Sequence, residues 1–273
     1  LAYGSLISEG FDVRISGQDV ERGTFSHRHA VVKVEDSEEE VILLDKIKDK
    51  KGNFYIYNSH LSEYGVLGFE YGYALASPKS LVIWEAQFGD FSNGAQIMID
   101  QYISAGEDKW NNQSGLVMLL PHGYENQGAE HSSARMERYL QMCAKHNMYI
   151  ADVTSPANFF HLMRRQLKTE FRKPLVVFSP KSLLRHPDVV SSMDDLANGQ
   201  FQEVIDDPKV ADKKAIKSLV FCTGKVYFDI IAEREVLGRN DVAVVRLEQL
   251  FPLAVDQIKE IIASYPNVDD YIW

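Results

Sequence analysis

Short apolar runs alternate with amphipathic segments along most of the chain. Five runs rich in β-branched residues are typical of strands buried on both faces: residues 11–15, 80–84, 115–120, 149–153 and 174–178. Between them, four segments have the apolar spacing of helices: residues 62–76, 95–104, 134–146 and 157–168. Strands that alternate with helices of this length are the pattern of a parallel sheet covered on both faces, so we predict an α/β layered domain.

Local signals mark the ends of two of these helices. Ser155 and Pro156 precede residues 157–168, which gives a capping hydroxyl followed by a proline in the first turn. Ser62 is placed to cap the helix that begins at Glu63. We therefore expect these two helices to begin at sharply defined positions.

A second unit follows a stretch of weaker periodicity. Residues 180–217 lose the pattern and are interpreted as a linker region, after which strand and helix patterns return: residues 218–222, 227–237, 242–246, 255–265 and 271–273. We predict a first domain over residues 1–200, a linker to about residue 216, and a truncated α/β domain over residues 217–273. Both ends of the chain look cut, which suggests a piece of a larger protein. The charged residues 35–52 are expected to form an exposed loop and hairpin.

Composition excludes several classes of protein. Lys and Arg number 29 and Asp and Glu number 39, so the formal net charge is −10 and binding to nucleic acid through its phosphates is not expected. The mixture of 45% hydrophobic and 25% charged residues is that of an ordinary globular protein. Apolar runs are far shorter than the roughly 20 residues that a bilayer crossing needs, so no membrane segment is expected.

Cysteine and histidine positions do not indicate a metal site. Cys143 and Cys222 are far apart and have no close Cys or His partner, which argues against a disulfide framework and a zinc cage. His27 and His29 have strand-like spacing but no third ligand nearby, so we expect no metal to be held by this chain.

Four polar stretches at strand-to-helix joins are the candidates for chemistry: residues 16–29, 58–63, 84–94 and 121–135. Parallel α/β sheets bind their ligands at such joins, because the carboxyl ends of the strands lie along one edge. The four stretches together could build one site. None of them matches a dinucleotide fingerprint or a P-loop.

Each candidate side chain also has a purely structural interpretation. Glu63 at the start of a helix is favoured by the positive end of the helix dipole. Phe88 and Phe91 are three residues apart and could belong to the core, and His131 could lie on a solvated face. Residue types and spacing alone leave both interpretations open.

The polar stretches closely resemble one enzyme family. The strings Leu61-Ser-Glu-Tyr-Gly-Val-Leu-Gly-Phe-Glu-Tyr-Gly72 and Trp84-Glu-Ala-Gln-Phe-Gly-Asp-Phe91, and residues 16–29, 122–135 and 179–187, resemble the thiamine-diphosphate-dependent decarboxylating component of the 2-oxoglutarate dehydrogenase complex. The resemblance covers essentially the whole chain. Two departures stand ahead of His131: Asn126 replaces the usual Gly and Ala129 the usual Pro.

The resemblance implies a fold and a cofactor. The fold would be the parallel-sheet pyrimidine-binding domain of the transketolase-like thiamine enzymes, followed by a truncated α/β C-terminal domain. The cofactor would be thiamine diphosphate. Family members hold Mg²⁺ and the diphosphate on an upstream domain through a Gly-Asp-Gly motif, and the sequence contains no Gly-Asp-Gly. The chain would therefore supply half of an active site that is completed across a homodimer.

Site residues follow from the same resemblance. Glu63 would contact the aminopyrimidine ring nitrogen and assist proton transfer. Phe91 would stack on the pyrimidine, with Phe88 as a neighbour, and Gln18 would lie near the cofactor. His131 would contact the substrate or a reaction intermediate.

The implied activity is the oxidative decarboxylation of 2-oxoglutarate in the citric acid cycle, with transfer of the succinyl unit to a lipoyl group. Its partners would be the dihydrolipoyl succinyltransferase and dihydrolipoyl dehydrogenase components, in the bacterial cytoplasm or the mitochondrial matrix. A related component acting on 2-oxoadipate and a nonenzymatic α/β interaction module are the alternatives.

Overall fold

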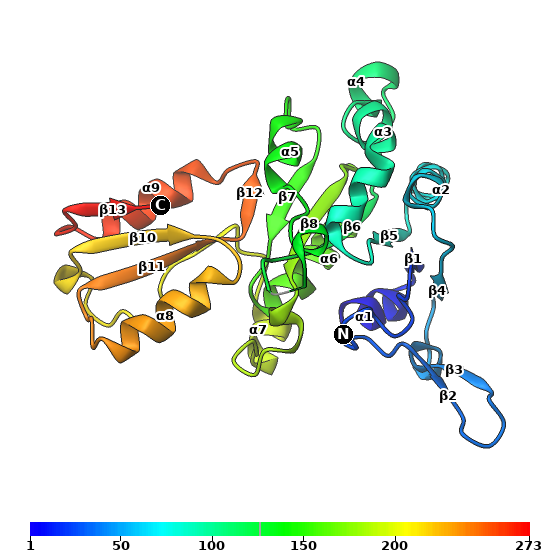
Figure 1. The fold of residues 1–273 in the computed structure, drawn as a ribbon, viewed down its shortest axis with the longest axis horizontal. Helices are drawn as coiled ribbons and strands as arrows, with labels where there is room; N and C mark the ends of the chain where they lie inside the picture. Colours follow the sequence, from blue (N-terminus) through cyan, green and yellow to red (C-terminus); the bar gives the residue numbers. More distant parts are fainter. Residues whose placement is uncertain (126) are drawn as a thin grey trace.

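A seven-stranded sheet forms the centre of the computed structural model, which describes residues 1–125 and 127–273 (Figure 1). Its strand order is β12-β7-β8-β6-β5-β1-β4. The strands are β1 (Val13–Gly17), β4 (Phe54–Asn58), β5 (Leu81–Glu85), β6 (Val117–His122), β7 (Tyr149–Asp152), β8 (Leu175–Pro180) and β12 (Gln249–Phe251). All neighbours are parallel except β12 and β7. The predicted parallel α/β sheet is confirmed, and β4 and β12 are additions to the prediction.

Helices cover both faces of this sheet. They are α1 (Ala2–Glu9), α2 (Glu63–Ala76), α3 (Gln96–Met98), α4 (Gly106–Trp110), α5 (Met136–Gln141), α6 (Pro156–Lys168) and α7 (Met193–Asn198). The predicted caps are confirmed: the Ser62 hydroxyl accepts from the Gly65 N–H, and the Ser155 hydroxyl accepts from the Asn158 N–H. No helix in the described part of the chain is long and apolar enough to cross a membrane.

Two predicted helices differ from the structure. Residues 95–104 are a short α3 between a 3₁₀ turn (Gly89–Ala95) and a π turn (Ile99–Ile103), rather than one regular helix. The helix predicted over 134–146 is limited to α5. It ends early because the Asn147 side chain accepts from the Ala144 N–H and donates to the Met142 carbonyl, and because Lys145 adopts a left-handed backbone.

Successive residues of the central strands enter two different cores. In β5, Leu81 and Ile83 pack with Leu6 of α1 and Met163 of α6, whereas the intervening Val82 and Trp84 pack on the opposite face with residues of α2 and α5. Period-two alternation directs neighbouring side chains to opposite faces. Because both faces are buried, the strands read as continuous apolar runs.

A buried ion pair ties α2 to the sheet. Arg14 of β1 donates from Nε and Nη2 to the Glu70 carboxylate, with the shortest N–O distances at 2.8 Å, and Glu70 is only 1% exposed. The guanidinium also lies over the rings of Tyr57, Phe69 and Tyr73, at 4.8–5.3 Å from their centroids. These contacts fix the helix that begins at Glu63.

A second, four-stranded sheet has the order β13-β10-β11-β9 and lies at one end of the molecule (Figure 1). Its elements are β9 (Val204–Ile205), β10 (Ser218–Cys222), α8 (Val226–Val236), β11 (Val242–Leu247), α9 (Val255–Ser264) and β13 (Asp270–Ile272). The predicted order of three parallel strands and two helices is confirmed, while β9 joins antiparallel from the stretch interpreted as a linker. At the opposite end, β2 (Val31–Lys33) and β3 (Glu40–Ile42) form the expected hairpin.

The two sheets are joined by a buried polar network. After β11 the chain continues through Glu248 into β12, which belongs to the first sheet. Glu248 is fully buried and accepts from the N–H and hydroxyl of Thr154 and from the Asn158 amide. Asp152 at the end of β7 accepts from the Thr223 hydroxyl at 3.3 Å. Both carboxyl groups are therefore removed from water at the junction.

The junction should make stability depend on pH. Burial and the neighbouring Glu248 carboxylate raise the pKa of Asp152 to about 8. The folded state then keeps a proton that the unfolded chain releases above about pH 4, so this group's contribution falls as pH rises from about 4 to about 8. We expect Asp152→Asn to flatten that decline.

Urea denaturation between pH 5 and pH 8.5 checks this, with Asp256→Asn as a control because the Asp256 side chain is 93% exposed. Stability curves of the wild type and the Asp152 variant that stay parallel across this range would contradict the assignment.

Candidate active site

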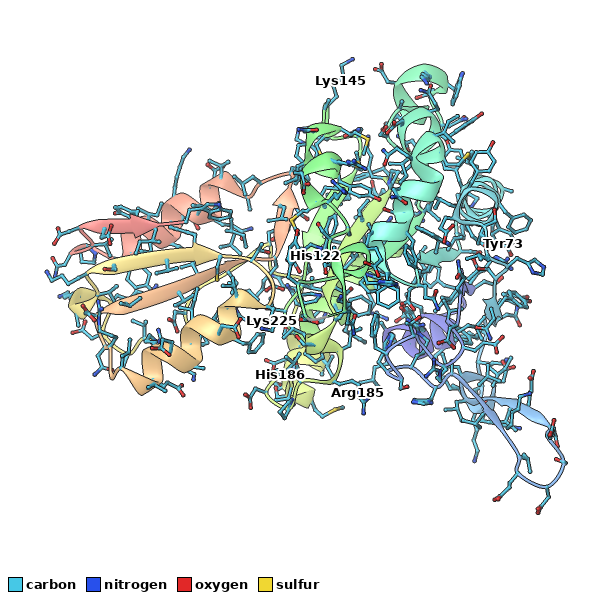
Figure 2. The ribbon with its side chains drawn as sticks, viewed as in Figure 1. Tyr73, His122, Lys145, Arg185, His186 and Lys225 are labelled. Carbon is cyan, nitrogen blue, oxygen red and sulfur yellow. The ribbon has the colours of Figure 1, made fainter. Side chains whose placement is uncertain are left out.

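Four strand ends bring the predicted polar stretches to one edge of the large sheet. Gly17, at the end of β1, pairs with Asn58 of β4 on one side and with Glu85 of β5 on the other. His122, at the end of β6, pairs with Pro180 of β8, and Figure 2 shows His122 near the middle of the molecule. The stretches 16–29, 58–63, 84–94 and 121–135 all begin or end at this edge.

Glu63 and Gln18 meet although they are distant in sequence. Glu63 is the first residue of α2, is partly buried, and accepts a 3.0 Å hydrogen bond at Oε1 from the Gln18 amide. The turn that precedes α3 approaches so closely that a Cβ built at Gly94 would lie 3.3 Å from Glu63 Oε2. The Glu63 carboxylate thus lies in the first turn of α2, where the helix dipole favours a negative charge. It also faces residues of the polar stretch 84–94.

Three partly buried rings form a cluster at the same edge. Phe88 and Phe91 lie 5.6 Å apart, and the His131 ring lies 4.4 Å from Phe88 and 5.3 Å from Phe91, all centroid to centroid. A glycine at position 89 lets the turn between Phe88 and Phe91 pack closely against Ala134 and Pro121. A Cβ at this position would lie 2.6 Å from Ala134 Cβ and 2.7 Å from the Pro121 carbonyl oxygen. The structure therefore brings together three of the five side chains singled out from sequence, and Gln18 with Glu63 forms the other pair.

His131 retains an unused polar atom. Its Nδ1 lies 3.1 Å from Glu130 Oε1 without hydrogen-bond geometry, and within residues 1–125 and 127–273 this buried atom has no hydrogen-bond partner. A backbone hydrogen bond and the neighbouring imidazole lower the pKa of the exposed Glu130. Ala129, one of the two departures from the family pattern, begins the short 3₁₀ turn that carries His131, and Asn126 lies outside the described residues.

An ion pair that was not predicted from the sequence lies at the same edge of the large sheet. Arg28 donates to both oxygens of Glu85 at the end of β5, and Glu85 is 5% exposed. Burial alone would lower the pKa of Arg28, but the adjacent Glu85 carboxylate raises it overall. His27 lies 3.9 Å from Glu85, and burial lowers its pKa. The Phe25 ring lies 6.2 Å from the His27 ring and 5.5 Å from the Phe88 ring, centroid to centroid, and so links His27 to the ring cluster.

The strand-like interpretation of His27 and His29 is wrong. His29 has a left-handed φ of 47°, and its Nε2 lies 3.1 Å from the Ser26 carbonyl oxygen, so the two rings are not paired on one face of a strand. Among the residues that the structure describes, no three His, Cys, Asp or Glu side chains gather into a group that could hold a metal ion.

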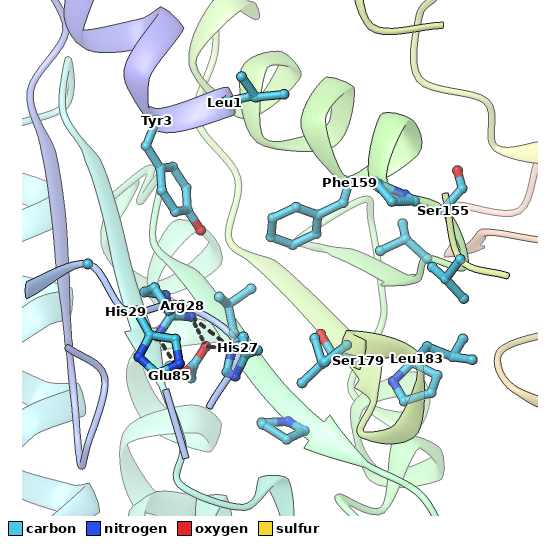
Figure 3. A pocket seen from close by; sticks show the side chains of 18 of the residues that line it. Leu1, Tyr3, His27, Arg28, His29, Glu85, Ser155, Phe159, Ser179 and Leu183 are labelled. Atoms are coloured by element: carbon cyan, nitrogen blue, oxygen red, sulfur yellow. Dashed lines mark hydrogen bonds and ion pairs between the residues drawn. The ribbon is translucent and has the colours of Figure 1, made fainter. Parts of the chain in front are cut away.

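A cavity of about 510 Å³ is lined in part by the Arg28–Glu85 pair (Figure 3). Its walls include Tyr3 of α1, Phe159 of α6 and Ser179 of β8, together with the ion pair itself. Burial raises the pKa of Tyr3 to about 12. Neither Glu63 nor the Phe88–Phe91–His131 cluster lines it, so the cavity lies beside these candidate side chains along the same strand edge.

Comparison with known proteins divides the chain into two matched parts. Residues 1–187 match the family described as transketolase, pyrimidine binding domain. Residues 190–273 match the family described as 2-oxoglutarate dehydrogenase C-terminal.

Individual bacterial proteins match the chain from end to end. It is 52% identical over 273 residues to the 2-oxoglutarate dehydrogenase E1 component of Haemophilus influenzae, covering 100% of this chain and 29% of that protein. Proteins of the same name from Coxiella burnetii and Azotobacter vinelandii are 53% and 51% identical, with the same coverage of 100% and 29%. The chain thus spans less than one third of the length of these relatives.

Proposed function

The chain belongs to the transketolase pyrimidine-binding domain family, and we propose that it binds the aminopyrimidine half of thiamine diphosphate within a 2-oxoglutarate dehydrogenase E1 component. The observation that carries this proposal is the convergence of a helix-start carboxylate and an aromatic pair on one sheet edge. The high identity to E1 components over the whole chain supports the choice of reaction.

The residues present fit a flat heteroaromatic ring. Glu63 offers an acceptor oxygen to a ring N–H, and the Gln18 amide holds that carboxylate in one orientation. Phe91 offers a ring face for stacking, with Phe88 packed edge-on against it. We propose that Glu63 holds and exchanges a proton with the pyrimidine nitrogen, a role that requires hydrogen-bond reach and a fixed geometry.

Bound thiamine diphosphate supplies an electron sink for loss of CO₂ from the 2-oxo acid. His131 is proposed to contact the substrate, because its ring lies against both phenylalanines at the strand edge. The ring cluster would exclude water from that contact.

We propose that Mg²⁺ and the diphosphate are held by another part of the E1 protein. Large apolar side chains are exposed just before α2 and along it: Leu61 81%, Tyr64 53% and Phe69 60%. Exposed apolar side chains beside the site favour a covering protein surface, and a second copy of the chain in a homodimer is the proposed occupant.

The proposed partners are the dihydrolipoyl succinyltransferase component, whose lipoyl group would take the succinyl unit, and the dihydrolipoyl dehydrogenase component. The bacterial sources of the matched relatives favour the bacterial cytoplasm over the mitochondrial matrix. A 2-oxoadipate-type dehydrogenase component and a nonenzymatic interaction module are the competing proposals.

Turnover by the full-length protein with thiamine diphosphate and Mg²⁺ tests the proposal. The expected result is CO₂ release from 2-oxoglutarate that depends on thiamine diphosphate. Higher kcat/KM with 2-oxoadipate would favour the related dehydrogenase, and no turnover of either acid would favour the interaction module.

His131→Ala is expected to reduce kcat for 2-oxoglutarate by roughly tenfold or more, because a pocket contact to the reacting group is lost. The affinity for thiamine diphosphate should be almost unchanged. Steady-state kinetics and calorimetric titration with the cofactor measure the two effects separately. Loss of cofactor binding with normal turnover at saturating cofactor would instead assign His131 to the cofactor contact.

A further inference from the structure

Lys181 is a buried lysine that contacts the candidate site without being part of it. It follows β8 directly, is 4% exposed, and its Nζ donates a 2.6 Å hydrogen bond to the backbone carbonyl of His131. The same Nζ lies 5.7 Å from the centroid of the Phe88 ring. A single ammonium therefore bonds the backbone of one member of the ring cluster and lies over the ring of another.

The loop that carries His131 is attached to the end of β8 at two further places. The Lys181 N–H donates to the His122 carbonyl at 3.1 Å. The Glu125 carboxylate accepts from the N–H and the hydroxyl of Ser182, at 2.9 and 2.5 Å. On the other arm of the loop, His122 Nδ1 accepts from the Ala134 N–H. Among these attachments, that of the Lys181 ammonium is the one made at His131 itself.

Removing the Lys181 ammonium from water costs free energy, and the packing of the sheet does not require a charged group at this position. Burial lowers the pKa of Lys181, while Glu125 and Asp90 act in the opposite direction. Its hydrogen bond is made to a neutral carbonyl rather than to a carboxylate. Among the residues that the structure describes, this ammonium forms no ion pair, so it is retained against its desolvation cost, which points to a role at the residue it holds.

We infer that Lys181 is a positioning residue for the reaction: its ammonium fixes the backbone of His131 so that the imidazole stays against Phe88 and Phe91. The inference rests on the proposed function of His131. It assigns Lys181 no contact with substrate or cofactor, and it predicts that the effect of Lys181 depends on the presence of the His131 side chain.

A double-mutant cycle in the full-length holoenzyme tests the inference. Lys181→Met keeps the length of the side chain but removes its charge and donors, and it is made alone and together with His131→Ala. Lys79→Met is the control, because Lys79 is exposed. CO₂ release from 2-oxoglutarate with an artificial two-electron acceptor gives kcat, and cofactor titration gives the affinity for thiamine diphosphate.

The expected result is a loss of about tenfold in kcat for Lys181→Met alone, with cofactor affinity changed less than about twofold. In the His131→Ala background the same substitution should change kcat by less than about twofold, because no imidazole remains to be positioned. The control should behave like the wild type.

Equal losses in both backgrounds, or no loss in either, would overturn the inference while leaving the proposed function intact. No turnover by the wild-type protein would overturn the proposed function, and the inference with it. If Lys181→Met does not fold, Lys181→Gln, which keeps a donor, replaces it in the cycle. Failure of both variants to fold would make the lysine structural and overturn the inference.

Discussion

Glu63→Gln is expected to lower turnover of 2-oxoglutarate by the full-length enzyme by about 10²-fold or more. The amide has nearly the same shape as the carboxylate, but it cannot hold and return a proton, and positioned proton transfer contributes at least that factor. The Gln18 contact at 3.0 Å shows that the carboxylate is held in one place rather than free in solvent. Steady-state kinetics at saturating thiamine diphosphate measure the effect.

The purely structural interpretation of Glu63 makes a different prediction. If the carboxylate served only the helix dipole, its loss would cost about 0.3–1 kcal/mol of stability and leave kcat unchanged. Glu260→Gln is the control, because Glu260 is exposed on α9. Near wild-type kcat in the Glu63 variant would remove this residue from the mechanism.

Arg14→Met is expected to destabilise the protein by about 3–5 kcal/mol, because it leaves Glu70 buried without its counter-ion. Glu70 is 1% exposed, so water cannot replace the guanidinium without opening the packing between α2 and β1. Urea denaturation followed by far-UV circular dichroism measures the loss.

The double variant Arg14→Met with Glu70→Leu is the matched control. Replacing both charges by apolar groups of similar volume removes the unpaired charge, so it should recover most of the lost stability. A double variant as unstable as Arg14→Met alone would show that the aromatic contacts of Arg14, rather than the ion pair, stabilise this part of the fold.

The parallel sheet could be predicted because its strands are buried on both faces. Leu81 to Trp84 and Val117 to Leu120 are continuous apolar runs, and such runs can occur only between two covering layers. The edge strand β4 was missed because only Phe54 and Ile56 are buried, while Tyr57 is 48% exposed. Three aromatic residues and Ile56 within these five positions nevertheless favour a strand, so this signal was present in the sequence.

The candidate site was only partly visible in the sequence. Residue types at strand ends predicted that the polar stretches meet at one sheet edge, and the family resemblance selected Glu63, Phe91 and His131 within it. The Arg28–Glu85 pair could not be predicted from spacing, because the two residues are 57 positions apart and meet only after β1 and β5 have paired. Lys181 lies in the resembling string 179–187, but neither its residue type nor its spacing singled it out, since burial decides its behaviour.

The crossing of β12 into the large sheet affects how this protein can be divided. A truncated protein that ends near residue 216 would lack β12. Its strand β7 would then expose backbone N–H and C=O groups to solvent. Such an open edge recruits strands from other molecules, so a shortened product, which would also lose Leu250 and Phe251 from its core, would tend to aggregate. A soluble expression boundary for the pyrimidine-binding family region therefore lies after Phe251, far beyond the point at which the sequence match to that family ends.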